Sequence, residues 1–165
     1  MKSLLFSLLL APAAAAAQMQ APPPSQAELR TASGAIEPKG ATTIKILTAD
    51  SASITYKKAV AGLLAQGYGI DKSDKDALFL STPAKSVDGS VFIKIQLVVA
   101  PASGGSVATF RSTFTWVSAT TIMAHVENRE LPVQFAGGAG GPSKRAWAAM
   151  KNAAVAALPG VVSYN

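Results

Sequence analysis

The sequence predicts an α+β fold, a two-layer sandwich in which an antiparallel sheet of about five to six strands carries two helices on one face. Two observations point to it. Two long segments near the middle of the chain alternate apolar and polar residues, as amphipathic strands do, and two other segments place apolar residues at helical spacing. The expected organisation is a signal peptide at 1–17, a flexible leader at 18–41 and a single α+β domain at 42–165.

The N-terminus has the order of a secretory signal peptide: Lys2, an apolar run at 4–10, Pro12 and a series of alanines ending at Ala17. An apolar run of this length does not cross a bilayer, which takes about 20 residues. We therefore expect cleavage after Ala17 and a periplasmic or secreted product. A retained anchor or a buried N-terminal helix is the alternative. The leader that follows contains three consecutive prolines and shows no sustained period.

A first strand is predicted at 42–48, where β-branched residues dominate. The next segment is expected to be a helix that ends at Gln66 and is followed by Gly67, a residue typical of the position after a helix. Its N-cap candidates are Asp50, Ser51 and Ser53. Helical spacing assigns Lys58, Gly62 and Gln66 to the solvent side. The side expected to face the sheet is formed by Tyr56, Val60, Leu63 and Leu64.

A hairpin is predicted next, with strands at 68–72 and 77–82 and a turn at 73–76. After another turn at 86–89 comes the clearest alternation in the chain. It predicts a long central strand at 91–99 with its inner face formed by Val91, Ile93, Ile95, Leu97 and Val99. The segment 101–106 is expected to turn the chain back into a strand at 107–117, whose inner face is formed by Ala108, Phe110, Phe114 and Trp116.

The segment 121–127 is a candidate for a further strand, and the glycine-rich stretch 136–142 breaks the chain after it. A last helix is expected from a Ser143 cap to Leu158, where Pro159 and Gly160 end it. The tail 161–165 is either loose or a strand. The inner face of this helix is formed by Trp147, Met150, Ala154 and Leu158, and both Trp116 and Trp147 are expected in the core.

Composition limits the chemistry. The chain has no cysteine, which excludes disulfides, a thiolate zinc site, a thiol nucleophile and a lipid-modified cysteine. The net charge is +6, yet only 15% of the residues are charged and the cations are scattered. For an exported chain this pattern predicts no nucleic-acid partner and at most weak contact with an anionic membrane surface. No cofactor is expected.

The residues do not form a recognisable catalytic set. His125 is the one histidine, and strand parity places it on the outer face beside Glu127, where a surface residue is the simpler interpretation than a general base. No GxSxG or SxxK motif is present, and one histidine without cysteine leaves a transition metal short of ligands. The acidic cluster of Asp71, Asp74 and Asp76 lacks the glycine and the closing glutamate of a calcium loop, so a solvated turn is expected.

One segment is a candidate anion site. Backbone N–H groups at the start of the last helix, helped by Lys144 and Arg145, are able to hold an anion. The segment 137–144 does not have phosphate-loop spacing, and Pro142 lacks one donor, so a flexible connection is the alternative interpretation. We also considered a basic surface across both helices, against the simpler interpretation of solvated helix faces, formed by Lys57, Lys58, Lys144, Arg145 and Lys151.

The order of elements over Thr42 to Leu158, with the helix end Leu64-Ala65-Gln66-Gly67-Tyr68 and the hairpin that opens on Gly67-Tyr68-Gly69-Ile70, resembles small bacterial envelope domains of the helix-grip type. The C lipoprotein of the outer-membrane β-barrel assembly machinery contains such domains. The resemblance implies a non-enzymatic module and transfers no functional residue. The missing lipobox cysteine departs from the lipoprotein pattern.

These observations predict an exported non-enzymatic module that binds a protein or another envelope component. A small-ligand carrier or hydrolase-like enzyme, with a cleft between helix and sheet near His125, is the first alternative. Peripheral binding to an anionic membrane is the second. We assign no catalytic, cofactor or metal residue, and the candidate ligand or anion contacts are His125, Lys144 and Arg145. A sheet face filled by Phe110, Trp116 and Trp147 favours the binding module, whereas a cavity there favours the carrier.

Overall fold

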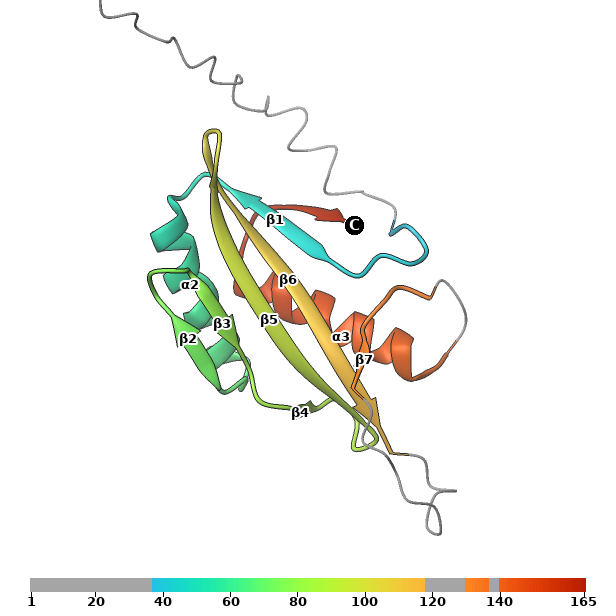
Figure 1. Ribbon diagram of the computed structural model, residues 1–165. Helices are drawn as coiled ribbons and strands as arrows, with labels where there is room; N and C mark the ends of the chain where they lie inside the picture. Colours follow the sequence, from blue (N-terminus) through green and yellow to red (C-terminus); the bar gives the residue numbers. More distant parts are fainter. Residues whose placement is uncertain (1–36, 118–129, 137–139) are drawn as a thin grey trace, which may run out of the picture.

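The computed structural model describes residues 37–117, 130–136 and 140–165. Within these ranges the chain forms two helices and eight strands (Figure 1). In chain order they are β1 (Ile44–Thr48), α2 (Ala52–Ala65), β2 (Lys72–Asp74), β3 (Phe79–Ser81), β4 (Lys85–Ser86), β5 (Val91–Ala102), β6 (Gly105–Trp116), β7 (Leu131–Pro132), α3 (Pro142–Ala157) and β8 (Val161–Tyr164). The predicted α+β class with an antiparallel sheet is confirmed.

The sheet has more strands than the predicted five to six, because several of them are too short to show a period in the sequence. Its main path is β2-β3-β5-β6-β1-β8, while β4 pairs with β5 and β7 pairs with β6. All of these pairs are antiparallel. The strand β1, the first of the described strands, lies between β6 and β8, which both come from the second half of the chain (Figure 1).

The centre of the sheet is the long hairpin of β5 and β6, with 12 residues in each strand. Its turn is shorter than the predicted 101–106, because the strands continue to Ala102 and restart at Gly105, so that only Ser103 and Gly104 remain between them. Gly104 has φ +77°, the left-handed conformation that a two-residue hairpin turn favours. At Gly105 a Cβ would lie 1.9 Å from the carbonyl oxygen of Thr48, so β1 approaches β6 where no side chain fits.

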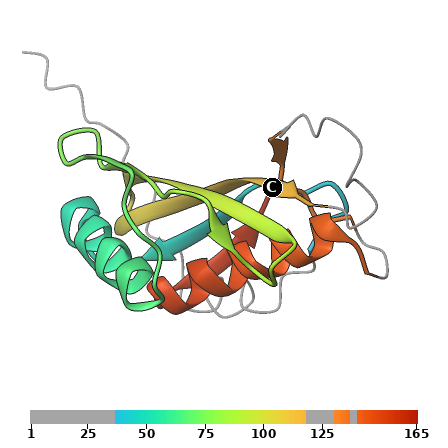
Figure 2. The same cartoon turned by 90° about the horizontal axis from the view of Figure 1, so that it is seen from below.

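Both helices cover the same face of the sheet (Figure 2). The five inward residues predicted for β5 are all buried, and Phe110 and Phe114 of β6 face the helices as expected. Trp147 of α3 is 2% exposed, as predicted for a core residue. Trp116 is 45% exposed, so the prediction that it lies in the core is wrong. Strand parity gives the correct side for Trp116 but does not tell how far the helices cover that side at the end of the strand.

The inner face of α2 differs from the prediction at four residues, Thr55, Ala59, Gly62 and Leu64. Thr55, Tyr56, Ala59 and Leu63 are the buried residues of this helix, and Leu64, which was expected inside, is 51% exposed. Gly62, which was expected in solvent, lies against α3, since a Cβ there would be 2.5 Å from the Cα of Ala157. A glycine contributes nothing to a hydrophobic pattern, yet it allows two helices to approach closely. Gly67 follows the helix with φ +74°, as predicted.

Other predicted boundaries also shift. The turn of the first hairpin lies at 75–78 and not at 73–76, and Leu78 in it has φ +49°. Residues 68–71 come before the strand. The helix α3 begins at Pro142 with Gly141 as N-cap, so Ser143 is not the cap. Its hydroxyl donates to the carbonyl oxygen of Gln134 at 2.9 Å. The tail forms β8, which pairs with β1.

Glu37, which comes before the predicted start of the domain at Thr42, already contacts the domain. The indole Nε1 of Trp147 donates to a Glu37 carboxylate oxygen at 3.3 Å, and Lys151 forms an ion pair with the same carboxylate. The hydrogen bond to Glu37 raises the pKa of Lys151. The predicted signal peptide, most of the predicted leader and the candidate strand at 121–127 lie outside the described residues. Within the described ranges, neither helix combines the length and the apolar character needed to cross a membrane.

Candidate functional site

The face of the sheet opposite the helices is covered by no helix among the described residues, and we call it the open face (Figure 2). It exists because every strand of an antiparallel sheet sends alternate side chains to each side, and both helices occupy only one of them. Its side chains come from β1, β3, β5, β6 and β8, and they are Lys45, Leu47, Phe79, Ser81, Phe92, Lys94, Gln96, Val98, Ala100, Val107, Thr109, Arg111, Thr113, Thr115, Val161 and Ser163.

Strand register aligns the apolar residues of the open face into a band. One row crosses four strands through Ala100, Val107, Leu47 and Val161, which are successive register partners. In the neighbouring row Phe79 lies opposite Val98, and Val98 is 45% exposed. Neighbouring side chains in such rows lie within contact distance of one another. The band is therefore a continuous apolar surface and not a set of scattered residues.

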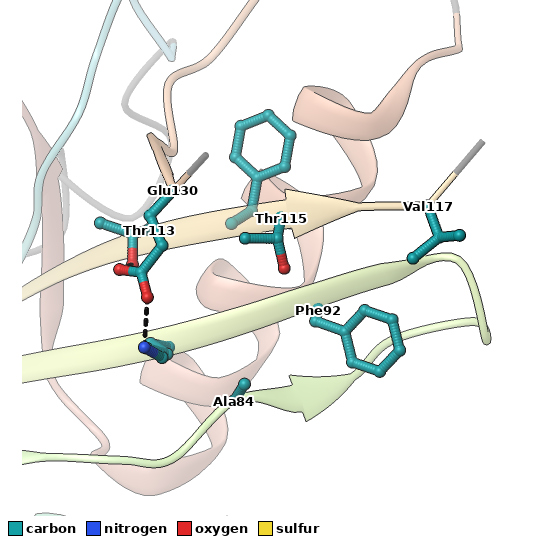
Figure 3. Close-up of a pocket in the computed structure, with 8 residues that line it drawn as sticks. Ala84, Phe92, Thr113, Thr115, Val117 and Glu130 are labelled. Atoms are coloured by element: carbon teal, nitrogen blue, oxygen red, sulfur yellow. Dashed lines mark hydrogen bonds and ion pairs between the residues drawn. The ribbon is translucent and has the colours of Figure 1, made fainter. Parts of the chain in front are cut away.

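The middle of the open face is polar and cationic. Gln96 and Arg111 are register partners, and both are exposed. Arg111 has no acidic partner among the described residues. One step further along the strands, Lys94 forms an ion pair with Glu130, and the hydroxyl of Thr113 donates to the other carboxylate oxygen at 3.2 Å (Figure 3). The hydrogen bond from Lys94 lowers the pKa of Glu130. Glu130 is thus held in its charged form and is a weak proton acceptor at neutral pH.

A shallow depression of about 370 Å³ lies beside this ion pair, at the end of the β5–β6 hairpin away from its turn (Figure 3). Phe92, Phe114 and Val117 form its apolar part, and Ala84 lines it on the side of β4. The depression contains the hydroxyl groups of Thr113 and Thr115 and the ion pair of Lys94 with Glu130, and the Glu130 carboxylate accepts the hydrogen bond from Thr113. These groups place hydrogen-bond donors and acceptors next to an apolar patch.

The opposite face of the sheet is filled by side chains. Phe110 is 0% exposed, and the ring of Trp147 packs between Phe135 at 5.9 Å and Tyr164 at 6.0 Å, measured between ring centroids. Every buried side-chain nitrogen or oxygen of the described residues has a hydrogen-bond partner. A ligand site inside the core would instead present polar groups with unused bonding capacity. Phe110 and Trp147, which a cavity would expose, therefore pack in the core, whereas Trp116 lies at the surface.

The candidate anion contacts take different positions. Lys144 and Arg145 both lie in the first turn of α3, and Lys144 is exposed with no partner among the described residues. Arg145 instead forms an ion pair with Asp88 and a 3.2 Å hydrogen bond with Ser90. The side-chain and backbone hydrogen bonds from Ser90, with further ones from Val91 and Arg145, lower the pKa of Asp88 to about 2. His125 and the glycines at 137–139 lie outside the described residues.

The considered basic surface of the two helices is largely neutralised. Lys58 pairs with Asp50 at 2.6 Å, Lys151 pairs with Glu37, and Arg145 pairs with Asp88. Of the five cations considered, Lys57 and Lys144 have no acidic partner within the described ranges. No group of three or more histidine, aspartate and glutamate side chains that could hold a metal ion is found in the described part of the chain.

The open face was not singled out from the sequence as a site. The sequence does carry a signal for it, because Phe92, Val98 and Val107 are large apolar residues at outward positions of alternating strands. A strand with one face in solvent normally places polar residues there. Alternation does not give the register, and only the register places Val107 next to Leu47 and Leu47 next to Val161, which come from distant parts of the chain.

No protein-family model matches the chain, and no curated protein matches it. Among solved structures, the chain is similar to a DUF4468 family protein from Bacteroides ovatus ATCC 8483, with 12% sequence identity and a TM-score of 0.33. The match covers 64% of this chain and 67% of that chain. A similarity at this level assigns neither a family nor a function, and the resemblance to helix-grip envelope domains stays a prediction.

Proposed function

We propose that the chain is an exported, non-enzymatic α+β module that binds a protein or another envelope component through the open face of its sheet. The observation that carries the proposal is the apolar band of the open face, in which Val98 and Ala100 are exposed and the remaining residues are partly exposed. Contiguous apolar surface of this kind is uncommon on monomeric proteins unless it is used for binding.

The size of the open face suits a protein partner. The strands β5 and β6, with 12 residues each, are roughly 40 Å long, and the shorter strands β1, β3 and β8 add to them at a spacing of about 4.8 Å, which gives a planar area of roughly 600 Å². A standard protein interface takes about 800 Å² from each partner. The open face offers an area of that order. Burial of its apolar band would supply most of the binding free energy, at about 25 cal/mol for each Å² removed from water.

The charges of the open face indicate the character of the partner. Arg111 lies at its centre without an acidic partner among the described residues, and a guanidinium group there is suited to a carboxylate. A partner with an apolar patch next to an acidic side chain matches this arrangement. The filled core gives the small-ligand carrier less support, since Phe110 and Trp147 occupy the space that a ligand between helices and sheet would need.

Site-specific photo-cross-linking in the native cell tests this proposal. We expect a photoreactive amino acid at Val98 or Arg111 to give one discrete cross-linked product. The matched control positions are Lys58 on α2 and Ala148 on α3, which are exposed on the helical layer and should not give this product. Excess purified wild-type domain should compete for the partner, and the Val98→Asp domain should not. Equal products from all four positions, or none from Val98 and Arg111, would contradict the proposal.

Export is tested separately by N-terminal sequencing of the protein from a cell-envelope or culture-medium fraction. We expect the mature chain to begin at Gln18, because small residues precede the bond after Ala17. A full-length chain that keeps Met1 and stays in the cytoplasm would overturn this part of the proposal and leave the binding surface to be judged on the cross-linking result.

A further inference from the structure

A second binding feature lies on the helical layer, and we call it the α2 groove. It runs between α2 and the 75–78 turn of the β2–β3 hairpin and has a volume of about 320 Å³. The hydroxyl of Tyr56 donates to the carbonyl oxygen of Phe79 at 3.1 Å and so ties the helix to the hairpin. The residues that line the groove are Ser53, Tyr56, Lys57, Val60, Ala61, Leu64, Lys75 and Leu78.

The inside of the α2 groove is apolar and accessible. Leu64 is 51% exposed, and Val60 and Leu78 are only partly buried. Leu78 also has φ +49°, a left-handed conformation that costs a residue with a Cβ about 1–2 kcal/mol. Backbone strain of this kind is found preferentially at sites that bind ligands. The hairpin thus holds a leucine side chain in the wall of the groove at a cost in backbone energy.

The charged residues of the α2 groove are cationic. Lys57 and Lys75 contribute from its two sides, and no acidic side chain lines it. Neither lysine has an acidic partner among the described residues, whereas the adjacent Lys58 pairs with Asp50. Asp74, the nearest carboxylate before Lys75 in the chain, accepts hydrogen bonds from the backbone N–H groups of Asp76 and Ala77, both at 2.9 Å. Two lysines that form no ion pair within the described residues therefore flank an apolar trough, and Asp74 and Asp76, which adjoin Lys75 in the chain, do not line it.

We propose that the α2 groove binds a single-chain anionic amphiphile of the fatty-acid type, with its acyl chain along α2 and its anionic head group between Lys57 and Lys75. The lining residues of α2 extend from Ser53 to Leu64, a rise of about 16 Å at 1.5 Å per residue, which suits a long and narrow occupant. The site lies apart from the open face and does not depend on the proposed function.

Titration with sodium dodecanoate below its micellar concentration tests the proposal, with ¹⁵N–¹H NMR of the domain at residues 18–165 as the readout. We expect saturable shifts of the amide signals of 56–64 and 75–78, with the open face unchanged. Dodecyltrimethylammonium has the same chain with the opposite charge and should bind at least about tenfold more weakly, a difference of about 1.4 kcal/mol. Acetate, the head group alone, should not bind.

Matched variants separate the site from the general charge of the domain. Lys57→Glu and Lys75→Glu should each weaken dodecanoate binding about tenfold, as expected for loss of a charge-assisted contact. Lys58→Glu changes the net charge equally but lies outside the groove, and binding should stay within about twofold of wild type. Leu78→Gly removes part of the wall at a backbone conformation that glycine adopts without strain, so it should fold and bind more weakly.

Several results would overturn the proposal. These are equal binding of the cationic amphiphile, equal losses in the Lys57→Glu and Lys58→Glu variants, or amide shifts that map to the open face. Binding to phosphatidylglycerol vesicles without binding of monomeric dodecanoate would also overturn it and would indicate contact with a membrane surface. Cross-linking from Val98 and Arg111 is expected to be unaffected by Lys57→Glu, so the failure of either proposal is visible without the other.

Discussion

Three buried hydroxyl groups join β1, α2 and β6. The Thr55 hydroxyl oxygen lies 2.8 Å from that of Thr48 and 2.7 Å from that of Ser106. The hydroxyl oxygens of Thr48 and Ser106 are 3.2 Å apart. Thr55 and Ser106 are 0% exposed. Hydroxyl groups in the core are tolerated when each has a partner, because the interior offers no water to replace one. Here the three groups satisfy one another.

We expect Thr55→Val to lower the free energy of unfolding by about 1–3 kcal/mol, although valine has nearly the same shape. The substitution leaves the hydroxyls of Thr48 and Ser106 buried with one partner fewer each. Urea denaturation followed by circular dichroism measures the change. The control is Thr42→Val, which changes an exposed residue. Equal effects of the two substitutions would show that the buried hydroxyl groups do not stabilise the fold.

Asp88 should titrate far below an ordinary aspartate. Its pKa is lowered to about 2, chiefly by the hydrogen bonds from Ser90, against about 3.9 in an unfolded chain. Because the folded value is the lower one, the stabilising contribution is present above about pH 4 and is lost as the pH falls to about 2. An NMR titration of the side-chain carboxyl carbon gives the midpoint directly. In Ser90→Ala the midpoint should rise, and an unchanged midpoint would contradict this origin of the shift.

The predictability of single residues follows from where their partners lie in the sequence. The position of Gly67 after α2 depends on local backbone geometry and was predicted correctly. Arg145, in contrast, pairs with Asp88, which is 57 positions away, and no local pattern joins the two. The α2 groove has the same origin, since Lys57 and Lys75 come from separate elements that only the fold brings together.

At the scale of elements, the contact between α2 and α3 depends on small residues. Gly62 lies where a Cβ would be 2.5 Å from the Cα and 2.7 Å from the carbonyl oxygen of Ala157. The side-chain amide of Gln66 donates to the carbonyl oxygen of Ala153 at 3.1 Å, so the same stretch of α2 also bonds to α3. The close approach thus replaces side-chain packing with backbone contact.

Gly62→Ala should destabilise the domain by about 1–3 kcal/mol, because an added methyl group forces the two helices apart. Helix propensity alone predicts the opposite sign, a gain of about 1 kcal/mol. The sign of the change in denaturant midpoint therefore decides between the two effects. Ala148→Gly, at an exposed position of α3, measures the effect of helix propensity alone on the free energy of unfolding. A stabilised Gly62→Ala variant would show that the helices have room to accept the methyl group.

Elements were predictable where the pattern is long. β5 and β6 have 12 residues each, enough for alternation to identify their inner faces, and both helices show a 3.6-residue period. The missed or uncertain strands β4, β7 and β8 have two, two and four residues. At that length pairing is decided by the neighbouring strand and not by the segment itself. The same limit explains why the band on the open face became visible only with the register.

At the scale of the whole molecule, β8 forms one edge of the sheet. This strand covers the edge of β1, and its Tyr164 contributes a ring against Trp147 in the core. The other edge strand, β2, consists of three exposed polar residues, Lys72, Ser73 and Asp74. A charged, short edge resists pairing with other chains. Without β8, β1 would form the opposite edge of the sheet, and that edge would lose its protection against pairing with other chains.

Deletion of 161–165 should therefore lower the unfolding temperature strongly and cause concentration-dependent aggregation. It removes the pairs between Ile46 and Val162 and between Ile44 and Tyr164, and it leaves the backbone groups of β1 unpaired. Thermal melts and light scattering at several protein concentrations measure both effects. Ser163→Thr keeps the strand and should change stability by less than about 0.5 kcal/mol. A truncated domain that melts like the full one would show that β8 is dispensable.

The position of β1 between β6 and β8 has a consequence for the timing of folding. As the chain emerges from the ribosome, β1 appears before both of the strands that flank it. Neither neighbour is available until most of the domain has been synthesised, and contacts between such distant segments form slowly. The complete sheet thus forms only when 161–164 have been released. Until that moment the edge of β1 that β8 covers has no strand beside it.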